Sequence, residues 1–160
     1  MNLGFAHTGS ERGTRDLAAE LAKSLLPGDV IALTGELGAG KTRFVQGLAY
    51  GLGMPENVPV TSPTFTFLAM YDQGRLKLYH FDFYRMCDAR EVERIGADEY
   101  LWGDGISVVE WADRAAEPIP DSALWIHFSF VGDGRELTFR AESARWQPVV
   151  QSLSGGRAWP

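Results

Sequence analysis

The sequence has 160 residues, with 15 Lys and Arg against 21 Asp and Glu, which gives a formal net charge of −6. A chain of this length is expected to form one domain and to bury enough apolar surface to fold without a disulfide or a metal. Its 45% hydrophobic and 22% charged residues are typical of a globular protein rather than a disordered one. The acidic balance disfavours a stand-alone nucleic-acid binder, because phosphate contacts need clustered Lys and Arg.

The expected compartment follows from the start of the sequence and from its cysteine content. Residues 1–8 have neither the basic start nor the apolar core of a secretory signal. No stretch approaches the roughly 20 apolar residues that span a bilayer. The single Cys87 cannot form an internal disulfide, which suits a reducing cytosol. We therefore expect a cytoplasmic protein that does not enter a membrane.

The first half of the chain alternates between predicted helices and a predicted strand. Residues 14–25 are expected to form a helix, because apolar residues recur on one face and a Pro-Gly pair follows. Residues 29–34 are a short apolar run rich in β-branched side chains, which is typical of a buried strand. A second amphipathic helix is predicted over 41–52, followed by a proline-containing loop over 54–64.

The middle of the chain predicts a hairpin, a broken helix and another buried strand. Strands are expected over 65–71 and 76–84, joined by a short turn. Helical spacing returns over 88–102, with a break near Gly96. The apolar run 105–110 is expected to be a second buried strand that ends in an acidic residue.

The last third predicts a second hairpin and then a loosely ordered end. Strands are expected over 123–131 and 136–141, and the chain from about residue 145 resembles a frayed tail. No internal repeat or linker divides the sequence. We therefore predict an α/β fold: one domain over 1–145, with a mixed central sheet flanked by helices, and a poorly ordered tail over 146–160.

One motif carries the clearest chemistry. Residues 35–42 read Gly-Glu-Leu-Gly-Ala-Gly-Lys-Thr, which matches the phosphate-binding P-loop pattern G-x-x-x-x-G-K-[ST] between a predicted strand and a predicted helix. The glycines let successive backbone N–H groups turn toward a phosphate, and the helix N-terminus faces the same point. We predict that Lys41 contacts the β- and γ-phosphates and that the Thr42 hydroxyl binds Mg²⁺. The predicted nucleotide site comprises Gly35, Glu36, Leu37, Gly38, Ala39, Gly40, Lys41 and Thr42. The motif therefore predicts that the domain over 1–145 is a P-loop NTPase domain.

Two acidic residues are candidates for the metal and for the attacking water. Asp82 lies inside the predicted strand 76–84, and Glu110 ends the strand 105–110. An acid at the end of an apolar strand beside a P-loop can hold Mg²⁺ or orient water. The alternatives are a solvent-exposed acid on an edge strand for Asp82 and a capping or salt-bridging acid for Glu110. The apolar run before Glu110 makes it the stronger candidate.

A hydroxyl-rich loop lies between the P-loop helix and the next strand. It contains Thr61, Ser62 and Thr64 around Pro63. In P-loop enzymes this position often hosts a switch segment that senses the γ-phosphate. A simple proline turn is the structural alternative.

Three functional classes stay open on these residues, and one class is excluded. A G protein needs an Asn-Lys-x-Asp motif to read guanine, and neither Asn2 nor Asn57 is followed by Lys. A small-metabolite P-loop kinase stays open, although no arginine-rich lid insertion is visible. An ATPase that acts on a partner needs only the loop, the metal-binding acids and a switch, and candidates for all three are present. A nucleotide-gated binding module without turnover is the remaining alternative.

Four segments occur in a fixed order along the chain: the P-loop at 35–42, Thr-Ser-Pro-Thr-Phe at 61–65, Tyr-His-Phe-Asp-Phe-Tyr-Arg at 79–85 and Val-Glu-Trp at 109–111. In this order and spacing they resemble the TsaE family, the small ATPases of bacterial tRNA threonylcarbamoyladenosine (t6A) modification. The P-loop alone is generic, but its combination with the other three segments is specific to that family. The similarity extends over about residues 10–140, close to the whole chain.

The resemblance implies a function that composition alone does not give. A protein of this family binds ATP with Mg²⁺ and hydrolyses ATP slowly on its own. It associates with a two-protein assembly of the TsaB and TsaD type, which transfers threonylcarbamoyl to adenosine 37 of tRNA. Hydrolysis would reset that assembly, and the transfer chemistry belongs to the partners. Because the chain is acidic, we expect it to bind nucleic acid weakly by itself.

The resemblance also implies roles for individual residues. The expected catalytic residues are Lys41, Asp82 and Glu110, and the expected metal ligands are Thr42, Asp82 and Glu110. Beside the P-loop, the nucleotide is expected to lie near Ser10 and Trp111. The expected switch residues are Thr61, Ser62 and Thr64.

Overall fold

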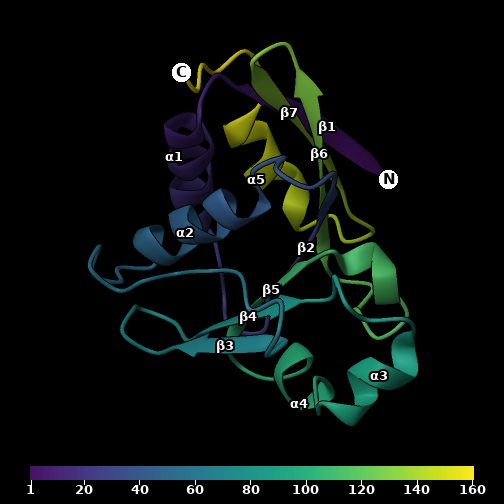
Figure 1. The fold of residues 1–160 in the computed structure, drawn as a ribbon. Helices are drawn as coiled ribbons and strands as arrows, with labels where there is room; N and C mark the ends of the chain where they lie inside the picture. The colour runs from purple at the N-terminus through teal and green to yellow at the C-terminus, as the bar shows by residue number, and fades with distance from the viewer.

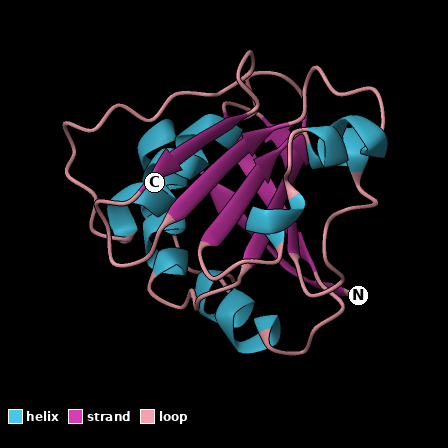
Figure 2. Ribbon diagram, turned by 90° about the horizontal axis from the view of Figure 1, so that it is seen from below, coloured by secondary structure: helices cyan, strands magenta, loops and turns pink.

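A seven-stranded mixed sheet runs through the computed structural model, which describes residues 1–160. The strand order is β1-β7-β6-β2-β5-β4-β3, and helices cover both faces of the sheet (Figures 1 and 2). The strands are β1 (Asn2–Thr8), β2 (Val30–Gly35), β3 (Leu68–Tyr71), β4 (Leu78–Asp82), β5 (Ile106–Glu110), β6 (Leu124–Val131) and β7 (Gly134–Arg140). The helices are α1 (Glu11–Ala22), α2 (Lys41–Gly51), α3 (Ala89–Arg94), α4 (Asp98–Leu101), the 3₁₀ turn η1 (Ala112–Ala115) and α5 (Trp146–Leu153). This arrangement confirms the predicted α/β class.

The centre of the sheet is parallel and its margins are antiparallel. Strands β6, β2, β5 and β4 run parallel to one another, whereas β1–β7, β7–β6 and β4–β3 are antiparallel pairs. Every residue of β4 and β5 is buried, as expected for strands covered on both faces. Because parallel strands end at the same edge, the carboxyl ends of β2, β4 and β5 meet there.

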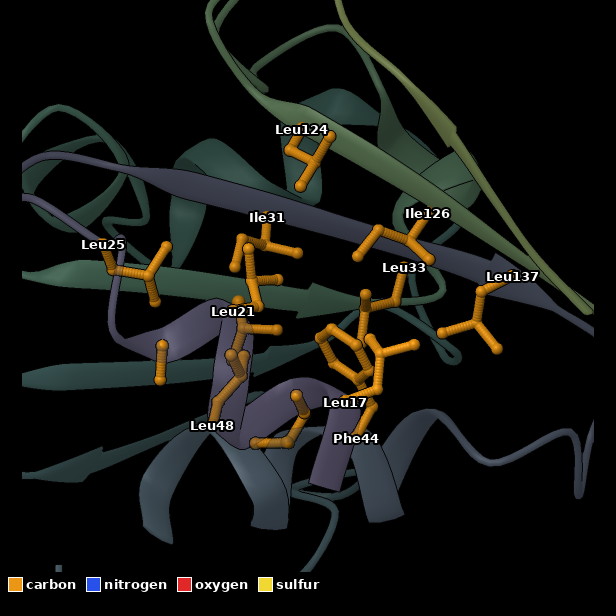
Figure 3. Packing of buried hydrophobic residues seen from close by; sticks show 14 of the residues in the cluster. Leu17, Leu21, Leu25, Ile31, Leu33, Phe44, Leu48, Leu124, Ile126 and Leu137 are labelled. Atoms are coloured by element: carbon orange, nitrogen blue, oxygen red, sulfur yellow. The ribbon is translucent and has the colours of Figure 1, made fainter. Parts of the chain in front are cut away.

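The larger of two hydrophobic cores lies between the sheet and helices α1, α2 and α5. It contains 29 buried residues, and side chains from α1 and α2 point toward β2 and β6 (Figure 3). A second core of 14 buried residues lies against α3, α4 and η1. Residues labelled in Figure 3 include Leu17 and Leu21 of α1, Leu25 just after that helix, Phe44 and Leu48 of α2, Ile31 and Leu33 of β2, and Leu124 and Ile126 of β6.

Helices α1 and α2 cross closely, and this contact places the start of α1 beside the P-loop. A Cβ atom added at Gly47 of α2 would lie only 2.3 Å from the carbonyl oxygen of Arg15 in α1. The absence of a side chain at Gly47 therefore allows the backbones to approach. Helix α1 also begins earlier than predicted: Ser10 is its N-cap and accepts a hydrogen bond from the backbone N–H of Gly13.

The two predicted hairpins are confirmed, with shorter strands at the first. β3 begins only at Leu68, because residues 64–67 form turns and Phe67 has a left-handed φ of 69°. The predicted helix over 88–102 is divided into α3 and α4, and Gly96, with φ of 73°, lies between them. No helix in the structure is long and apolar enough to span a bilayer.

Strand β1 was not predicted from the sequence. It forms an edge of the sheet by pairing with β7, and Ala6 and Thr8 are its only buried residues. With so few buried residues, the alternation of apolar and polar side chains that predicts a strand is weak in this part of the sequence. The strand depends on its partner strand rather than on its own hydrophobic pattern.

The structure also corrects the expectation of a frayed C-terminal tail. Residues 146–153 form helix α5, which packs against β1. Trp146, Val150 and Leu153 are buried at helical spacing, and the indole Nε1 of Trp146 donates to the carbonyl of Ser122 at 2.8 Å. Trp159 is buried as well. The short helix is stabilised mainly by tertiary packing. The helix propensity of eight residues does not include that contribution, so the sequence alone did not predict α5.

Candidate functional site

The candidate site lies at the edge of the sheet where β2, β4 and β5 end. Asp82 and Glu110 are the last residues of β4 and β5 and lie directly opposite each other in the register. A cavity of about 630 Å³ opens at this edge. Ligands of open α/β sheets bind in the crevice outside the carboxyl ends of the strands, and this cavity occupies that position.

Most of the predicted site residues line this cavity. Gly35 and Glu36 do not line it, but their carbonyl oxygens accept hydrogen bonds from Lys41, which does. Thr61 lies outside the cavity, on a neighbouring groove between α1, α2 and the loop 54–61. The predicted residues that line the cavity are Ser10, Leu37, Gly38, Ala39, Gly40, Lys41, Thr42, Ser62, Thr64, Asp82, Glu110 and Trp111.

The P-loop leads directly into α2 and leaves the start of that helix open. Gly40 is the N-cap with a left-handed φ of 108°, a conformation that favours glycine, and no side chain caps the helix. The N–H groups of the first turn have no intrahelical acceptors, and they carry the positive end of the helix dipole. Backbone N–H groups of this kind form a binding site for a phosphate.

Lys41 is held under the P-loop with its ammonium group nearly buried. Its Nζ donates to the carbonyl oxygens of Gly35 at 2.6 Å and Glu36 at 2.9 Å, and lies 4.0 Å from the ring centroid of Trp111. Burial lowers the pKa of Lys41 from its usual value, and the nearby carboxylates of Glu110, Asp113 and Asp82 oppose that shift. The arrangement fixes a cation at the base of the cavity.

Glu110 is buried and is held at both carboxylate oxygens. The Thr42 hydroxyl donates to Oε1 at 2.9 Å, and Nε2 of His80 lies 2.5 Å from Oε2. Glu110 is only 2% exposed, and it both lines the cavity and makes the ion-pair contact with His80 that the salt-bridging alternative described. The P-loop helix and strand β5 therefore meet through a side-chain hydrogen bond inside the cavity.

Asp82 has a separate set of partners. Its Oδ2 accepts hydrogen bonds from the hydroxyls of Ser62 and of Thr64, the latter at 3.0 Å, and its Oδ1 accepts from the backbone N–H of Tyr84 at 2.8 Å. Asp82 is 1% exposed and β4 is not an edge strand, which rules out a solvent-exposed edge acid. The carboxylate thus ties the hydroxyl-rich loop to the sheet.

Trp111 follows Glu110 in a left-handed backbone conformation, with φ of 57°. This turn places the indole ring over Lys41 and at 4.9 Å, centroid to centroid, from the ring of Tyr84. Ser10 approaches the cavity from the start of α1. Both residues therefore line the same cavity as the P-loop, and their contact with a nucleotide stays a prediction.

Sequence reasoning did not single out several residues that line the cavity. The most notable is Arg135, at the start of β7, which donates through Nε to the carbonyl of Ala39 at 3.1 Å and through Nη2 to that of Gly38 at 3.3 Å. The sequence places Arg135 only in the turn between the predicted strands 123–131 and 136–141. Arg135 lies near the P-loop because it follows the end of β6, and β6 is the strand that neighbours β2. That position indicates a role at the site only when the strand order is known. The others are Glu11, Thr14, Arg43, Tyr84, Asp133 and Gly134.

The residues at the cavity fit a magnesium ion that is shared with a nucleotide. Thr42, Glu110 and Asp82 offer only oxygen atoms, which are the ligands that Mg²⁺ prefers. No group of three or more His, Cys, Asp or Glu side chains is arranged to hold a metal without other ligands. That set suits Mg²⁺, which usually binds one or two carboxylates together with water and substrate phosphates.

Comparisons with a family model and with named relatives point to the same family. The family model described as "Threonylcarbamoyl adenosine biosynthesis protein TsaE" matches residues 8–137. A Bacillus subtilis protein named tRNA threonylcarbamoyladenosine biosynthesis protein TsaE is 45% identical over 142 residues, covering 88% of this chain and 87% of its own length. A Treponema pallidum protein of the same name is 44% identical over 130 residues, covering 81% and 94%.

A solved structure extends the similarity to three dimensions. The crystal structure of Bacillus subtilis YdiB superposes with a TM-score of 0.82 at 38% sequence identity, covering 96% of this chain and 95% of that one. The match to the family model includes the P-loop, both buried acids and the hydroxyl-rich loop. The chain belongs to the TsaE family.

Proposed function

We propose that this chain binds ATP with Mg²⁺ and hydrolyses it slowly, as a component of the tRNA N6-threonylcarbamoyladenosine (A37) modification machinery. Hydrolysis would reset a partner transferase assembly of the TsaB and TsaD type. Membership of the family and the names of the relatives support the t6A role. The family and the relatives' names also favour the t6A role over the small-metabolite kinase that the sequence left open.

One observation carries the proposal for nucleotide chemistry. Lys41 and Thr42 of the P-loop line the same cavity as Glu110, which comes from a distant strand, and Thr42 donates to Glu110 at 2.9 Å. A glycine-rich turn with a purely structural role would not need a buried lysine and a buried acid at one point. The combination matches the parts that phosphoryl-transfer sites of this class require.

The chain's own residues would bind and orient the phosphates. The uncapped first turn of α2 offers backbone N–H groups, and Lys41 adds a fixed positive charge. Thr42, Glu110 and Asp82 would hold the magnesium ion. When bound, that ion supplies charge that offsets the phosphate oxygens. The ring of Trp111 lies over the ammonium of Lys41 and stabilises the cation through its π face.

The two buried acids have different contacts and therefore different proposed roles. Glu110 is fixed beside Thr42, where its carboxylate can orient a water and accept a proton from it. Asp82 holds Ser62 and Thr64, so a change at the metal would be transmitted to the loop 61–67. We propose that this loop is the switch segment that signals the nucleotide state to partners.

The division of labour with the partners follows from charge. A chain with net charge −6 is poorly suited to hold tRNA by itself, so the partner assembly would provide most of the RNA contacts and the transfer chemistry. We propose that the protein works in the cytoplasm. The free, exposed Cys87 suits such a reducing compartment.

The proposal is tested by measuring phosphate release from ATP by the purified chain, alone and with a TsaB–TsaD-type assembly and tRNA. We expect slow release alone and faster release with the assembly, both dependent on Mg²⁺. Absence of ATP and ADP binding under all conditions would rule the proposal out. Transfer of labelled γ-phosphate to a small-molecule pool would instead favour the kinase, and binding without turnover would favour the nucleotide-gated module.

A further inference from the structure

His80 is a fully buried titratable residue to which the proposed mechanism gives no role. It lies on β4, where side chains alternate between the two cores: Tyr79 and Phe81 belong to the smaller core, and Leu78 belongs to the larger one. His80 and Asp82 therefore face the side of the sheet on which α2 packs. On β5 the same alternation turns Glu110 to that side, because Val108 belongs to the larger core.

The strand register alone does not bring His80 and Glu110 together as a directly opposed pair. Asp82 lies directly opposite Glu110, and His80 is its diagonal neighbour. Nevertheless Oε2 of Glu110 lies 2.5 Å from Nε2 of His80, while Asp82 is occupied by the hydroxyls of Ser62 and Thr64. A glutamate carboxylate without a proton only accepts hydrogen bonds, and in that form of Glu110 the contact is made by an N–H at Nε2 of His80.

The other ring nitrogen of His80 shows that the imidazole is not explained by packing. Nδ1 is the only buried side-chain nitrogen or oxygen in the structure without a hydrogen-bond partner. An unpaired buried polar atom costs stability, and an apolar side chain of similar size would fill the space without that cost. What the imidazole adds at this position is the N–H that donates to Glu110.

We infer that His80 is a positioning residue for Glu110, an inference that rests on the proposed ATPase function. The imidazole holds Oε2 on the core side, so that Oε1 faces Thr42 and the cavity. His80 does not line the cavity and therefore acts on the nucleotide only through Glu110. Hydrogen-bond partners of this kind fix the orientation of a ligating or catalytic carboxylate and raise its effectiveness.

The test compares three substitutions at this position in the full chain, with and without the partner assembly. H80F keeps a ring but removes the donor. H80Q carries an amide that reaches the position of Nε2, whereas the shorter amide of H80N reaches only the position of Nδ1. H80N is therefore a matched polar control, because it cannot donate to Glu110. The measurements are kcat and KM for ATP hydrolysis, the Kd for ATP and thermal unfolding.

We expect H80F and H80N to lower kcat by about 10- to 100-fold, the usual loss when an outer partner of a ligating residue is removed. ATP affinity should stay close to that of the wild type, and H80Q should recover most of the lost kcat. In an E110Q background, H80F should cause little further loss, since the two residues act as one unit. The non-additivity would separate positioning from a general packing defect.

Two results would overturn the inference. One is a wild-type kcat for H80F. The other is an equal loss for H80F and H80Q that follows their unfolding temperatures and adds to the loss caused by E110Q. Failure of the proposed function would look different, because the wild-type chain itself would then release no phosphate from ATP with its partners. If H80F does not fold, the comparison of H80Q with H80N decides the question alone.

Discussion

The Thr42 hydroxyl donates a 2.9 Å hydrogen bond to Oε1 of Glu110, across 68 positions of the sequence. This bond joins the first turn of α2 to the last residue of β5 inside one cavity. If the Thr42 hydroxyl turns to another partner, the carboxylate of Glu110 loses this hydrogen bond. Nucleotide binding at the P-loop and the acid expected to orient water are coupled by a direct bond rather than by a long pathway.

Replacing Lys41 by alanine should weaken ATP binding. The ammonium is fixed by two carbonyl oxygens at the base of the cavity, and a hydrogen bond to a charged group contributes about 1.5–3 kcal/mol, or roughly 10- to 160-fold in Kd. Isothermal titration with ATP and Mg²⁺ measures the change. Lys23→Ala is the matched control, because this lysine lies on the surface after α1 and pairs only with Glu20. Equal Kd values for the two variants would contradict the assignment.

Replacing Glu110 by glutamine should separate binding from hydrolysis. The amide keeps the size of the side chain but is a poor proton acceptor, and loss of a general base costs about 10²–10⁴-fold in rate. ATP affinity should change little. Single-turnover measurements with labelled ATP detect the effect. A wild-type rate for E110Q in the complete assembly would show that another group activates the water.

Replacing Asp82 by alanine should loosen the loop 61–67. The carboxylate accepts hydrogen bonds from Ser62 and Thr64, and these hydroxyls would lose their shared acceptor. We expect faster amide hydrogen exchange across the loop, together with slower ATP hydrolysis. Asp72→Ala, in the turn between β3 and β4, serves as the control and should leave both measurements unchanged. Unaltered exchange in D82A would argue against its role in the switch.

Replacing Trp146 by alanine should destabilise the fold, because α5 is part of the larger core. Trp146 is 1% exposed, and truncating a buried aromatic residue costs about 3–5 kcal/mol, or roughly 6–20 °C in Tm for a chain of this size. Trp102→Ala is the matched control: this side chain is 70% exposed, and its loss should change the free energy of unfolding by less than about 0.5 kcal/mol. Similar Tm values for the two variants would contradict the packing of α5.

The isolated chain should bind tRNA only weakly. Its net charge of −6 offers few uncompensated cations, so we expect affinity no tighter than non-specific binding, about 10⁻⁴–10⁻⁶ M at physiological salt. Filter binding over a salt series measures it. A tight complex that dissociates steeply with salt would place RNA recognition on this chain instead of its partners.

Local sequence signals predicted the parts of the site that are encoded locally. The P-loop needs only a strand, a glycine-rich turn and a helix in succession, and Gly35 to Thr42 provide them within eight residues. Glu110 could be found because it ends a buried apolar run. The central strands were predicted for the same reason, since strands buried on both faces leave continuous apolar runs.

Contacts that depend on the strand order could not be predicted from one sequence. Arg135 reaches the P-loop carbonyls only because β7 and β6 are added beside β2, and His80 meets Glu110 only because β4 pairs with β5. Strand β1 and helix α5 were missed for a related reason. Strand β1 pairs with β7 and packs against α5, and α5 packs against β1 and α1, so both elements depend on partners that are distant in the sequence.

A coupling of ATP hydrolysis to t6A formation is tested most directly by counting the t6A modifications formed per partner assembly when this chain, ATP and tRNA are supplied. With the wild-type chain, we expect repeated rounds of modification that follow ATP hydrolysis. With E110Q, which should bind ATP without turning it over, modification should stop after about one round per assembly. Repeated rounds with E110Q, at the wild-type rate and without phosphate release, would show that hydrolysis does not reset the assembly.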